Sequence, residues 1–273
     1  MATLPAYLNG IGGTSGYGVT TRSPLAMTGA IWYVHKDGSD AASPRGKERI
    51  RPLASLAQAH TNASAGDIIV CLSGHTETLT AAQTFNKAGI HVYGEGTGSS
   101  RPQFICGGAI DMFDVTAAGV WFCNLYFPAS TTAPNSRIRI ASVGTRVEDC
   151  LFECGTNDTA ECIEYITGAG EALVKGTTFS STSGSVSSQP ATGILVSNAM
   201  NNLVIGGPND ADAVVFDGGS SGWSNPYVIK CSAAVTRLLM LNIDLLNDSD
   251  IDTGSSTPVT FLLRNKSGSA RII

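Results

Sequence analysis

Acidic side chains that could cleave a glycosidic bond gather in three short stretches of this sequence. Glycoside hydrolysis needs two carboxyl groups on either side of the bond, about 5 to 9.5 Å apart. On a chain with so few charges, acidic residues also serve as solvated edge residues or turn formers. We favour that interpretation and assign no catalytic residue. The three groups are Asp111 and Asp114; Glu148, Asp149 and Glu153; and Glu161, Glu164 and Glu171.

Cysteines and histidines do not predict a metal or cofactor site. The sequence has no C-x-x-C pair, and no histidine lies near Cys150, Cys154 and Cys162. An odd number of thiols favours free, buried cysteines. His75 has no nucleophile or metal partner close in sequence, so we expect a loop residue and not a general base. The cysteines are Cys71, Cys106, Cys123, Cys150, Cys154, Cys162 and Cys231, and the histidines are His35, His60, His75 and His91.

Aromatic and basic residues indicate little recognition chemistry. Trp32 and Trp121 lie in expected strands and should pack, whereas Trp223 lies in a loop and is the best candidate for an exposed contact with a sugar. The net charge of −5 argues against nucleic-acid binding. The basic residues between Arg45 and Arg51 are interrupted by Glu48, which indicates a solvated loop.

Composition narrows the fold to one rich in short strands. Only 14% of the 273 residues are charged, too few for the wet faces of long helices, and 31 are glycine. No apolar run reaches the ~18 to 20 residues that cross a bilayer. The segment 1–20 lacks the basic start and apolar centre of a secretion signal, so export is not expected.

The first thirty residues differ from the rest. They carry a single charge, Arg22, and a glycine-rich centre that cannot form a core of its own. We favour an extended arm that lies along a partner over a disordered tail. The predicted domains are therefore an arm over residues 1–30 and one folded unit over residues 31–273.

A loose repeat predicts that residues 31–273 wind as a coil of stacked strands. Six turn-forming residues recur at intervals of 25 to 36 residues, and the residue two places before each one is apolar. Stacked rungs place like residues above one another about 4.8 Å apart. Few two-residue hairpin signals occur, which disfavours an antiparallel sandwich or jelly roll. The turn residues are Gly94, Asn124, Asp149, Gly176, Gly206 and Asn242; those two places before are Val92, Phe122, Val147, Val174, Val204 and Met240; and those three places after are Thr97, Phe127, Phe152, Phe179, Asn209 and Leu245.

Residues outside these columns are expected to form loops and a final strand. Polar segments predict excursions at residues 180–189, 218–225 and 247–256. The apolar segment after Thr257 predicts one more strand and a short tail.

Four short motifs follow one another between residues 31 and 77. They are Asp-Gly-Ser-Asp at 37–40, Pro52 with Ser-Leu-x-x-Ala at 55–59, Ala-Gly-Asp-Ile-Ile-Val at 65–70, and Gly74 with Glu77, one place earlier than usual. Together they resemble the opening of pectate-lyase-like parallel β-helix proteins. The resemblance implies an all-β, right-handed, single-stranded parallel β-helix. It also implies a short helix near residues 53–60, begun by Ser55, that caps the amino end.

The resemblance leaves two classes of function open. Lyases of this superfamily use calcium held by several carboxylates and an arginine or lysine base, and Arg137, Arg139 and Arg146 cannot be matched to that pattern. The arm and the coil together look most like virion components of tailed bacteriophages, which assemble in the host cytoplasm. We expect a non-enzymatic capsid cement or decoration protein, a homotrimer that binds the major capsid protein or other virion proteins through residues 1–30. The alternative is a tailspike-like glycan-binding protein or polysaccharide depolymerase, hence a glycoside hydrolase or lyase.

Overall fold

The computed structural model describes residues 29–41, 45–130, 132–155, 161–181, 192–218, 227–246, 250–256 and 259–263. The predicted arm therefore lies outside the described residues, except for Gly29 and Ala30. Trp223 and most of the expected loops at 180–189 and 218–225 also lie outside them. Among the described residues, no helix has the length and apolar character needed to span a membrane.

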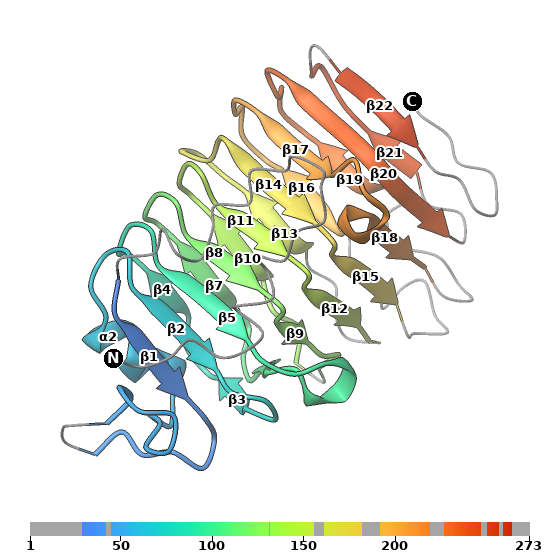
Figure 1. Ribbon diagram of the computed structural model, residues 1–273. Helices are drawn as coiled ribbons and strands as arrows, with labels where there is room; N and C mark the ends of the chain where they lie inside the picture. The colour runs from blue at the N-terminus through green and yellow to red at the C-terminus, as the bar shows by residue number, and fades with distance from the viewer. Residues whose placement is uncertain are drawn as a thin grey trace.

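The chain forms a parallel β-helix, as the sequence predicts. Every pairing between described strands is parallel, and each strand pairs with equivalent strands of the rungs before and after it. Figure 1 shows the rungs stacked along one axis, from α2 and β1 at one end to β20 and β22 at the other. The parallel pairing excludes the alternative fold, a sandwich or jelly roll of two facing antiparallel sheets.

Each rung has three faces. The first face is made of β1 (Ile31–Val34), β2 (Ile68–Cys71), β5 (His91–Gly94), β8 (Trp121–Cys123), β11 (Arg146–Glu148), β14 (Ala172–Lys175), β17 (Leu203–Gly206), the first half of β20 (Leu238–Leu246) and β22 (Val259–Leu263). The second is made of β3 (Thr76–Leu79), β6 (Gln103–Cys106), β9 (Tyr126–Phe127), β12 (Leu151–Cys154), β15 (Thr178–Ser181), β18 (Val214–Asp217) and the second half of β20. The third is made of β4 (Gln83–Phe85), β7 (Asp111–Val115), β10 (Ser136–Ile140), β13 (Glu161–Tyr165), β16 (Ile194–Val196), β19 (Tyr227–Cys231) and β21 (Asp250–Asp252).

A file of phenylalanines fills the interior. The rings of Phe127, Phe152, Phe179 and Phe216 stack nearly parallel, with centroids 4.7, 5.0 and 4.8 Å apart. These separations match the distance between hydrogen-bonded strands, because each ring sits on the equivalent residue of the next rung. All four side chains are fully buried, which confirms the predicted internal column.

The predicted columns are wrong at two rungs, and the reason is the same in both. Thr97 and Asn209 do not continue the aromatic file; Phe104 and Phe216 do, because a short 3-10 helix lengthens the preceding turn. These helices are η2 (Gly98–Ser100) and η4 (Asp210–Asp212). In the second of these rungs, Ile205 occupies the inner column that was predicted for Val204.

Asparagines of the following rungs hold both lengthened turns. The side-chain amide of Asn124 donates to the carbonyl oxygens of Gly94 (2.7 Å) and Gly96 (2.9 Å). Asn242 repeats these contacts with Gly207 (2.6 Å) and Asn209 (3.2 Å). At Gly94 the approach is so close that a Cβ atom would lie 2.2 Å from the carbonyl oxygen of Asn124, so only glycine fits.

Helix α2 (Leu56–Asn62) covers the amino end of the coil. As predicted, Ser55 is its N-cap and accepts a hydrogen bond from the Gln58 amide at 3.2 Å. The helix begins at Leu56 and not at Leu53, which forms a parallel bridge with Val34 instead. At the other end, the Lys87 ammonium donates to the carbonyl oxygens of His60, Thr61 and Ala63.

Glu77 joins this helix to the aromatic file. It pairs in register with Phe104, and its Oε2 accepts the amide hydrogen of Leu56 at 2.9 Å. Asp67 fixes the beginning of the coil in a similar way, because it accepts hydrogen bonds from Ala30, Trp32 and Ser64. These bonds hold the pKa of Asp67 below its usual value against the opposing effect of burial.

Two further sequence expectations can be compared with the strands. The strand predicted after Thr257 is present as β22. The segment 247–256, predicted as a turn, contains β21. Strand β21 continues the third face beside β19, so pairing with the previous rung overrides the polar composition of this segment.

Shortening one ring of the aromatic file should destabilise the whole coil. We expect Phe179→Ala to lower the free energy of unfolding by about 3–5 kcal/mol, because it leaves a cavity between two stacked rings. Phe179→Leu should cost less. Equilibrium urea denaturation measures both. The exposed Ile50 provides a control, since Ile50→Ala should change stability by less than about 0.5 kcal/mol. Equal effects of the two alanine variants would contradict the role assigned to the file.

Candidate functional site

The third face brings together acidic residues that the sequence places in separate groups. Asp114, Arg139 and Glu164 lie in register on adjacent strands, and Asp111 stands in the neighbouring column. Arg139 contacts Asp114 (Nη1 to Oδ1, 3.2 Å) and Asp111 (Nε to Oδ2, 3.7 Å). Ser136 donates from Oγ to Asp111 Oδ1 at 2.9 Å. The arrangement is a ladder of opposite charges along the coil axis.

Glu161 and Glu164 continue this ladder on β13. Glu164 accepts a hydrogen bond from Ser197 Oγ at 2.7 Å. Burial raises the pKa of Glu161; Glu164 and Asp111 also raise it, whereas the Glu161 backbone and Lys230 act in the opposite sense. Among the carboxyl groups of this ladder, Glu161 is the one whose pKa is raised, and an upward shift is the direction that an acid catalyst needs.

A 25-residue spacing could have revealed this ladder from the sequence. Asp111, Ser136 and Glu161 are 25 residues apart, and so are Asp114, Arg139 and Glu164. Both intervals equal the length of one rung here, so they place these residues in columns. Grouping residues by closeness in sequence missed the ladder.

The group Glu148, Asp149 and Glu153 is separated by the fold. Glu148 lies on the first face, Asp149 occupies the left-handed turn (φ 55°), and Glu153 lies on the second face. Glu153 accepts a hydrogen bond from the Tyr126 hydroxyl. Burial and this bond both raise the pKa of Tyr126. These three carboxylates therefore do not converge on one substrate position.

Glu171 is likewise placed apart from the third face. It adopts a left-handed conformation (φ 51°) just before β14, and its carboxylate accepts a hydrogen bond from the Asn202 side chain of the next rung. The group of Glu161, Glu164 and Glu171 is thus reduced to its first two members.

Lys175 stands between two carboxylates at the turn from the first to the second face. Its Nζ lies 3.5 Å from Glu148 Oε2 and 3.4 Å from Asp212 Oδ1. Burial lowers the pKa of Lys175, but the two carboxylates outweigh it and the net shift is upward. A lysine that serves as a base needs a lowered pKa, so Lys175 is not arranged as the base of a lyase.

The three arginines considered for a lyase point in different directions. Arg137 is buried inside the coil, where its Nη2 donates to the Glu153 carbonyl oxygen at 2.7 Å. Arg139 belongs to the ladder of the third face. Arg146 lies on the first face, with its Nη1 3.8 Å from Glu148 Oε1. They do not form one cationic site.

His75 lies in the loop before β3 (Thr76–Leu79), as expected, and its side chain is fully buried there. Its Nε2 lies 3.2 Å from Glu77 Oε2, and its ring packs against Phe104. Because Glu77 also holds the first amide of α2, His75 supports the capping helix. Its contact with Phe104 joins residues far apart in the chain, so local sequence does not reveal this placement.

The tryptophans on the described strands pack, as expected. The ring of Trp32 is covered by the Lys47 ammonium at 3.5 Å, and its indole donates to Asp67. Trp121 meets His91 edge to face at 5.0 Å. It packs against an apolar cluster on the outer side of the first face, not in the interior, and the cluster includes Ile68, Val70 and Tyr93.

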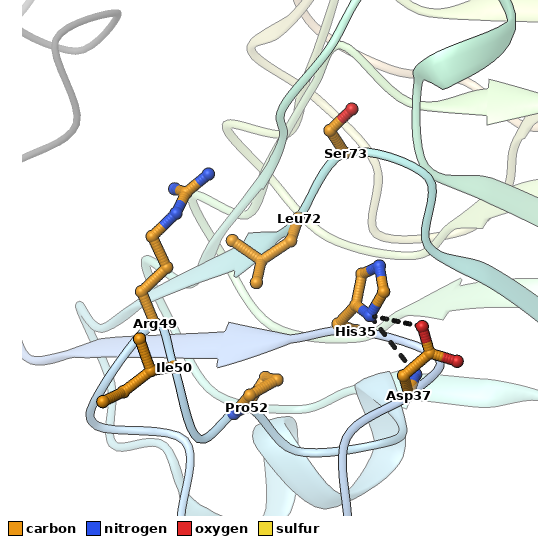
Figure 2. A pocket seen from close by; sticks show the side chains of 7 residues that line it. All are labelled: His35, Asp37, Arg49, Ile50, Pro52, Leu72 and Ser73. Atoms are coloured by element: carbon orange, nitrogen blue, oxygen red, sulfur yellow. Dashed lines mark hydrogen bonds and ion pairs between the residues drawn. The ribbon is translucent and has the colours of Figure 1, made fainter.

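A shallow, open pocket of about 390 Å³ lies beside β1 and β2 (Figure 2). Among its lining residues, Leu72 is buried and Ile50 is exposed. Arg49 pairs with Glu95 through both terminal nitrogens, and His35 Nδ1 lies 3.5 Å from Asp37 Oδ2. Its charged groups are thus engaged with protein partners, and its lining mixes polar and apolar side chains. The basic loop is exposed as predicted, but Arg49 and Lys47 attach it to the coil.

All seven cysteines are buried and reduced, as the sequence predicts for free thiols. Among the described residues, no group of three or more histidines, cysteines, aspartates or glutamates is arranged to hold a metal ion.

Comparisons with known proteins find one distant structural likeness and assign no activity. No family model matches the chain, and no curated protein matches its sequence. Among solved structures, the crystal structure of pectate lyase Pel9A matches with a TM-score of 0.38 and 14% sequence identity, covering 88% of this chain and 79% of that one. So distant a likeness carries no inference about chemistry. The assignment of this chain to the parallel β-helix class rests on its own strand pairings.

The raised pKa of Glu161 predicts a pH-dependent effect of Glu161→Gln. Ionisation of Glu161 costs more free energy in the folded than in the unfolded chain. The ionised carboxylate therefore lowers the stability of the fold at pH values above the pKa that Glu161 has in the folded protein. This destabilisation disappears as pH falls below about 4.5, the usual value. Glu161→Gln should therefore melt above the wild type at pH 7, and the difference should vanish near pH 4, as thermal melts at several pH values would measure.

Glu164→Gln is the matched control on the same strand. It weakens the charge-assisted hydrogen bond from Ser197, so its melting temperature should not rise at pH 7. A pH-independent gain in Glu161→Gln would contradict the electrostatic account.

Proposed function

We propose that this chain is a structural β-helix protein of a tailed-bacteriophage virion, a cement or decoration protein that stabilises neighbouring capsid subunits. In this proposal it assembles in the host cytoplasm as a homotrimer. Residues 1–30 bind the major capsid protein or another virion protein. The coil contributes rigidity and shape instead of catalysis.

The single observation that supports this proposal is how the carboxylates are used. Nearly all of those that the sequence offers for glycan chemistry bind a side chain of an adjacent rung. Asp111 and Asp114 bind Arg139, Glu148 binds Lys175, and Glu164 binds Ser197. Acidic residues used in this way stabilise the contacts between adjacent rungs. A structural protein that must resist mechanical load needs such contacts.

The junction between arm and coil supports a separable arm. Gly29 packs so closely on Gly66 that a Cβ atom added to Gly29 would lie 2.0 Å from the carbonyl oxygen of Gly66. The backbone amide of Ala30 donates a hydrogen bond to Asp67 Oδ1 at 2.7 Å. These two residues therefore belong to the coil. The segment 2–28 can be removed without breaking these contacts.

Deleting residues 2–28 should abolish binding to phage particles that lack the protein, while the melting temperature of the coil stays nearly unchanged. Co-sedimentation with particles and thermal melts measure the two effects. A variant with residues 2–28 scrambled keeps the arm's composition and should also fail to bind. Retained binding by the truncated chain would remove the arm from the proposal. A particle copy number near that of the major capsid protein supports the capsid, and a few copies per particle would indicate a tail part instead.

The alternative is a tailspike-like glycan depolymerase, and Glu161 is the observation that favours it. Its pKa is raised beside other carboxylates, and an upward shift is what the acid of a glycoside hydrolase needs. Incubation with host capsular or lipopolysaccharide glycans, followed by size analysis of the chains, tests it. Under our proposal no chain is shortened. Shortening that disappears in Glu161→Gln, Glu164→Gln or Glu153→Gln would establish the enzyme and defeat the structural role. Saturable glycan binding without cleavage, lost on Trp223→Ala, would indicate a tail adaptor.

A further inference from the structure

Two cysteines and an arginine meet inside the corner between the second and third faces. Cys154 ends β12 and Cys162 lies in β13, and both side chains are fully buried. Their sulfur atoms are 3.4 Å apart. The two sulfur atoms are in contact. In a disulfide they would be about 2.05 Å apart, so a small movement of the side chains would bring them to bonding distance.

The guanidinium group of Arg137 is held against both sulfurs. Its Nη1 lies 3.2 Å from Cys154 Sγ and 3.5 Å from Cys162 Sγ, while Nη2 donates to the Glu153 carbonyl oxygen at 2.7 Å. Arg137 is only 1% exposed. A guanidinium stays protonated in proteins, and a cation beside a thiol favours the thiolate, which is the form that attacks oxidants and disulfides.

We propose that Cys154 and Cys162 are a redox-active dithiol that closes to a disulfide when it meets a peroxide. The Cys154 thiolate attacks one peroxide oxygen, the O–O bond breaks, and the hydroxide that leaves takes up the thiol's proton to become water. The sulfur is now a sulfenic acid. The Cys162 sulfur attacks it, the S–O bond breaks, and a second water leaves. Two thiols and one hydrogen peroxide become one disulfide and two waters; each sulfur loses one electron and each oxygen gains one.

The disulfide would tie the end of the second face to the start of the third, at the residue immediately after Glu161. Cross-linking residues 154 and 162 restricts the unfolded chain and so stabilises the fold. The expected rise in melting temperature is roughly 5 °C for a chain of this size. This inference is independent of the virion function proposed above.

Peptide mapping after oxidation tests the proposal. The reduced full-length protein is treated with hydrogen peroxide, unfolded with an alkylating reagent, and digested after glutamate. Glu153 and Glu161 directly precede the two cysteines, so cleavage separates peptide 154–161 from peptide 162–164. We expect a linked product two hydrogen masses below the sum of the peptides. It should be lost in Cys154→Ala and Cys162→Ala but retained in Cys106→Ala.

The role of Arg137 is tested by the pH profile of the reaction. Arg137→Met should move the pH of half-maximal oxidation rate upward, because the thiolate loses its cation, whereas Arg137→Lys should keep most of the effect. A purely structural arginine would change stability without moving this profile.

Oxidative refolding covers the case in which buried sulfurs are shielded from peroxide. The unfolded, reduced chain is refolded with reduced and oxidised glutathione, where thiol–disulfide exchange supplies the oxidation. A dominant 154–162 link supports the proposal. Its absence from both experiments, or a yield no greater than that of links through Cys106 or Cys231, overturns it.

Discussion

The stacking of parallel rungs at the spacing of hydrogen-bonded strands is the constraint on which the rest of this structure depends. Once rungs stand about 4.8 Å apart, each side chain lies on its counterpart in the next rung. Aromatic rings then stack face to face, as Phe127, Phe152 and Phe179 do, at nearly the same separation. Charged residues are stabilised by opposite charges in the same column, and Arg139 finds one in Asp114.

The open end of the coil imposes a second demand, because the first rung has no preceding rung to pair with. Helix α2 covers it, and polar side chains at both of its ends hold the helix there. Glu77 and Ser55 bind its first turn, and Lys87 binds its last carbonyl oxygens. The motifs of residues 31–77 therefore have a structural explanation: they carry the residues that attach this cap and, through Asp67, the first strand.

The use of charged residues in contacts within the coil bears on function. In a protein with 14% charged residues, most described acidic residues are engaged with neighbouring rungs or with the cap. Lys175 is neutralised by Glu148 and Asp212, and Arg49 by Glu95. Burial works against the charges of Glu148, Asp149 and Glu161. Of the groups considered, Glu161 on the third face and Arg137 with its two thiols inside the corner are those to which we assign chemistry beyond the scaffold.

The amino-acid sequence by itself determined the fold class, the capping helix with Ser55 at its start, and the inner file that includes Phe127, Phe152 and Phe179. These features follow from local signals: turn residues with left-handed geometry, an N-cap, and apolar residues at rung spacing. Tertiary structure alone decided which acidic residues meet, where His75 points, and that Arg137 contacts Cys154. Those positions depend on how many residues each turn inserts, and η2 and η4 shift the register by amounts that only pairing with the neighbouring rung fixes.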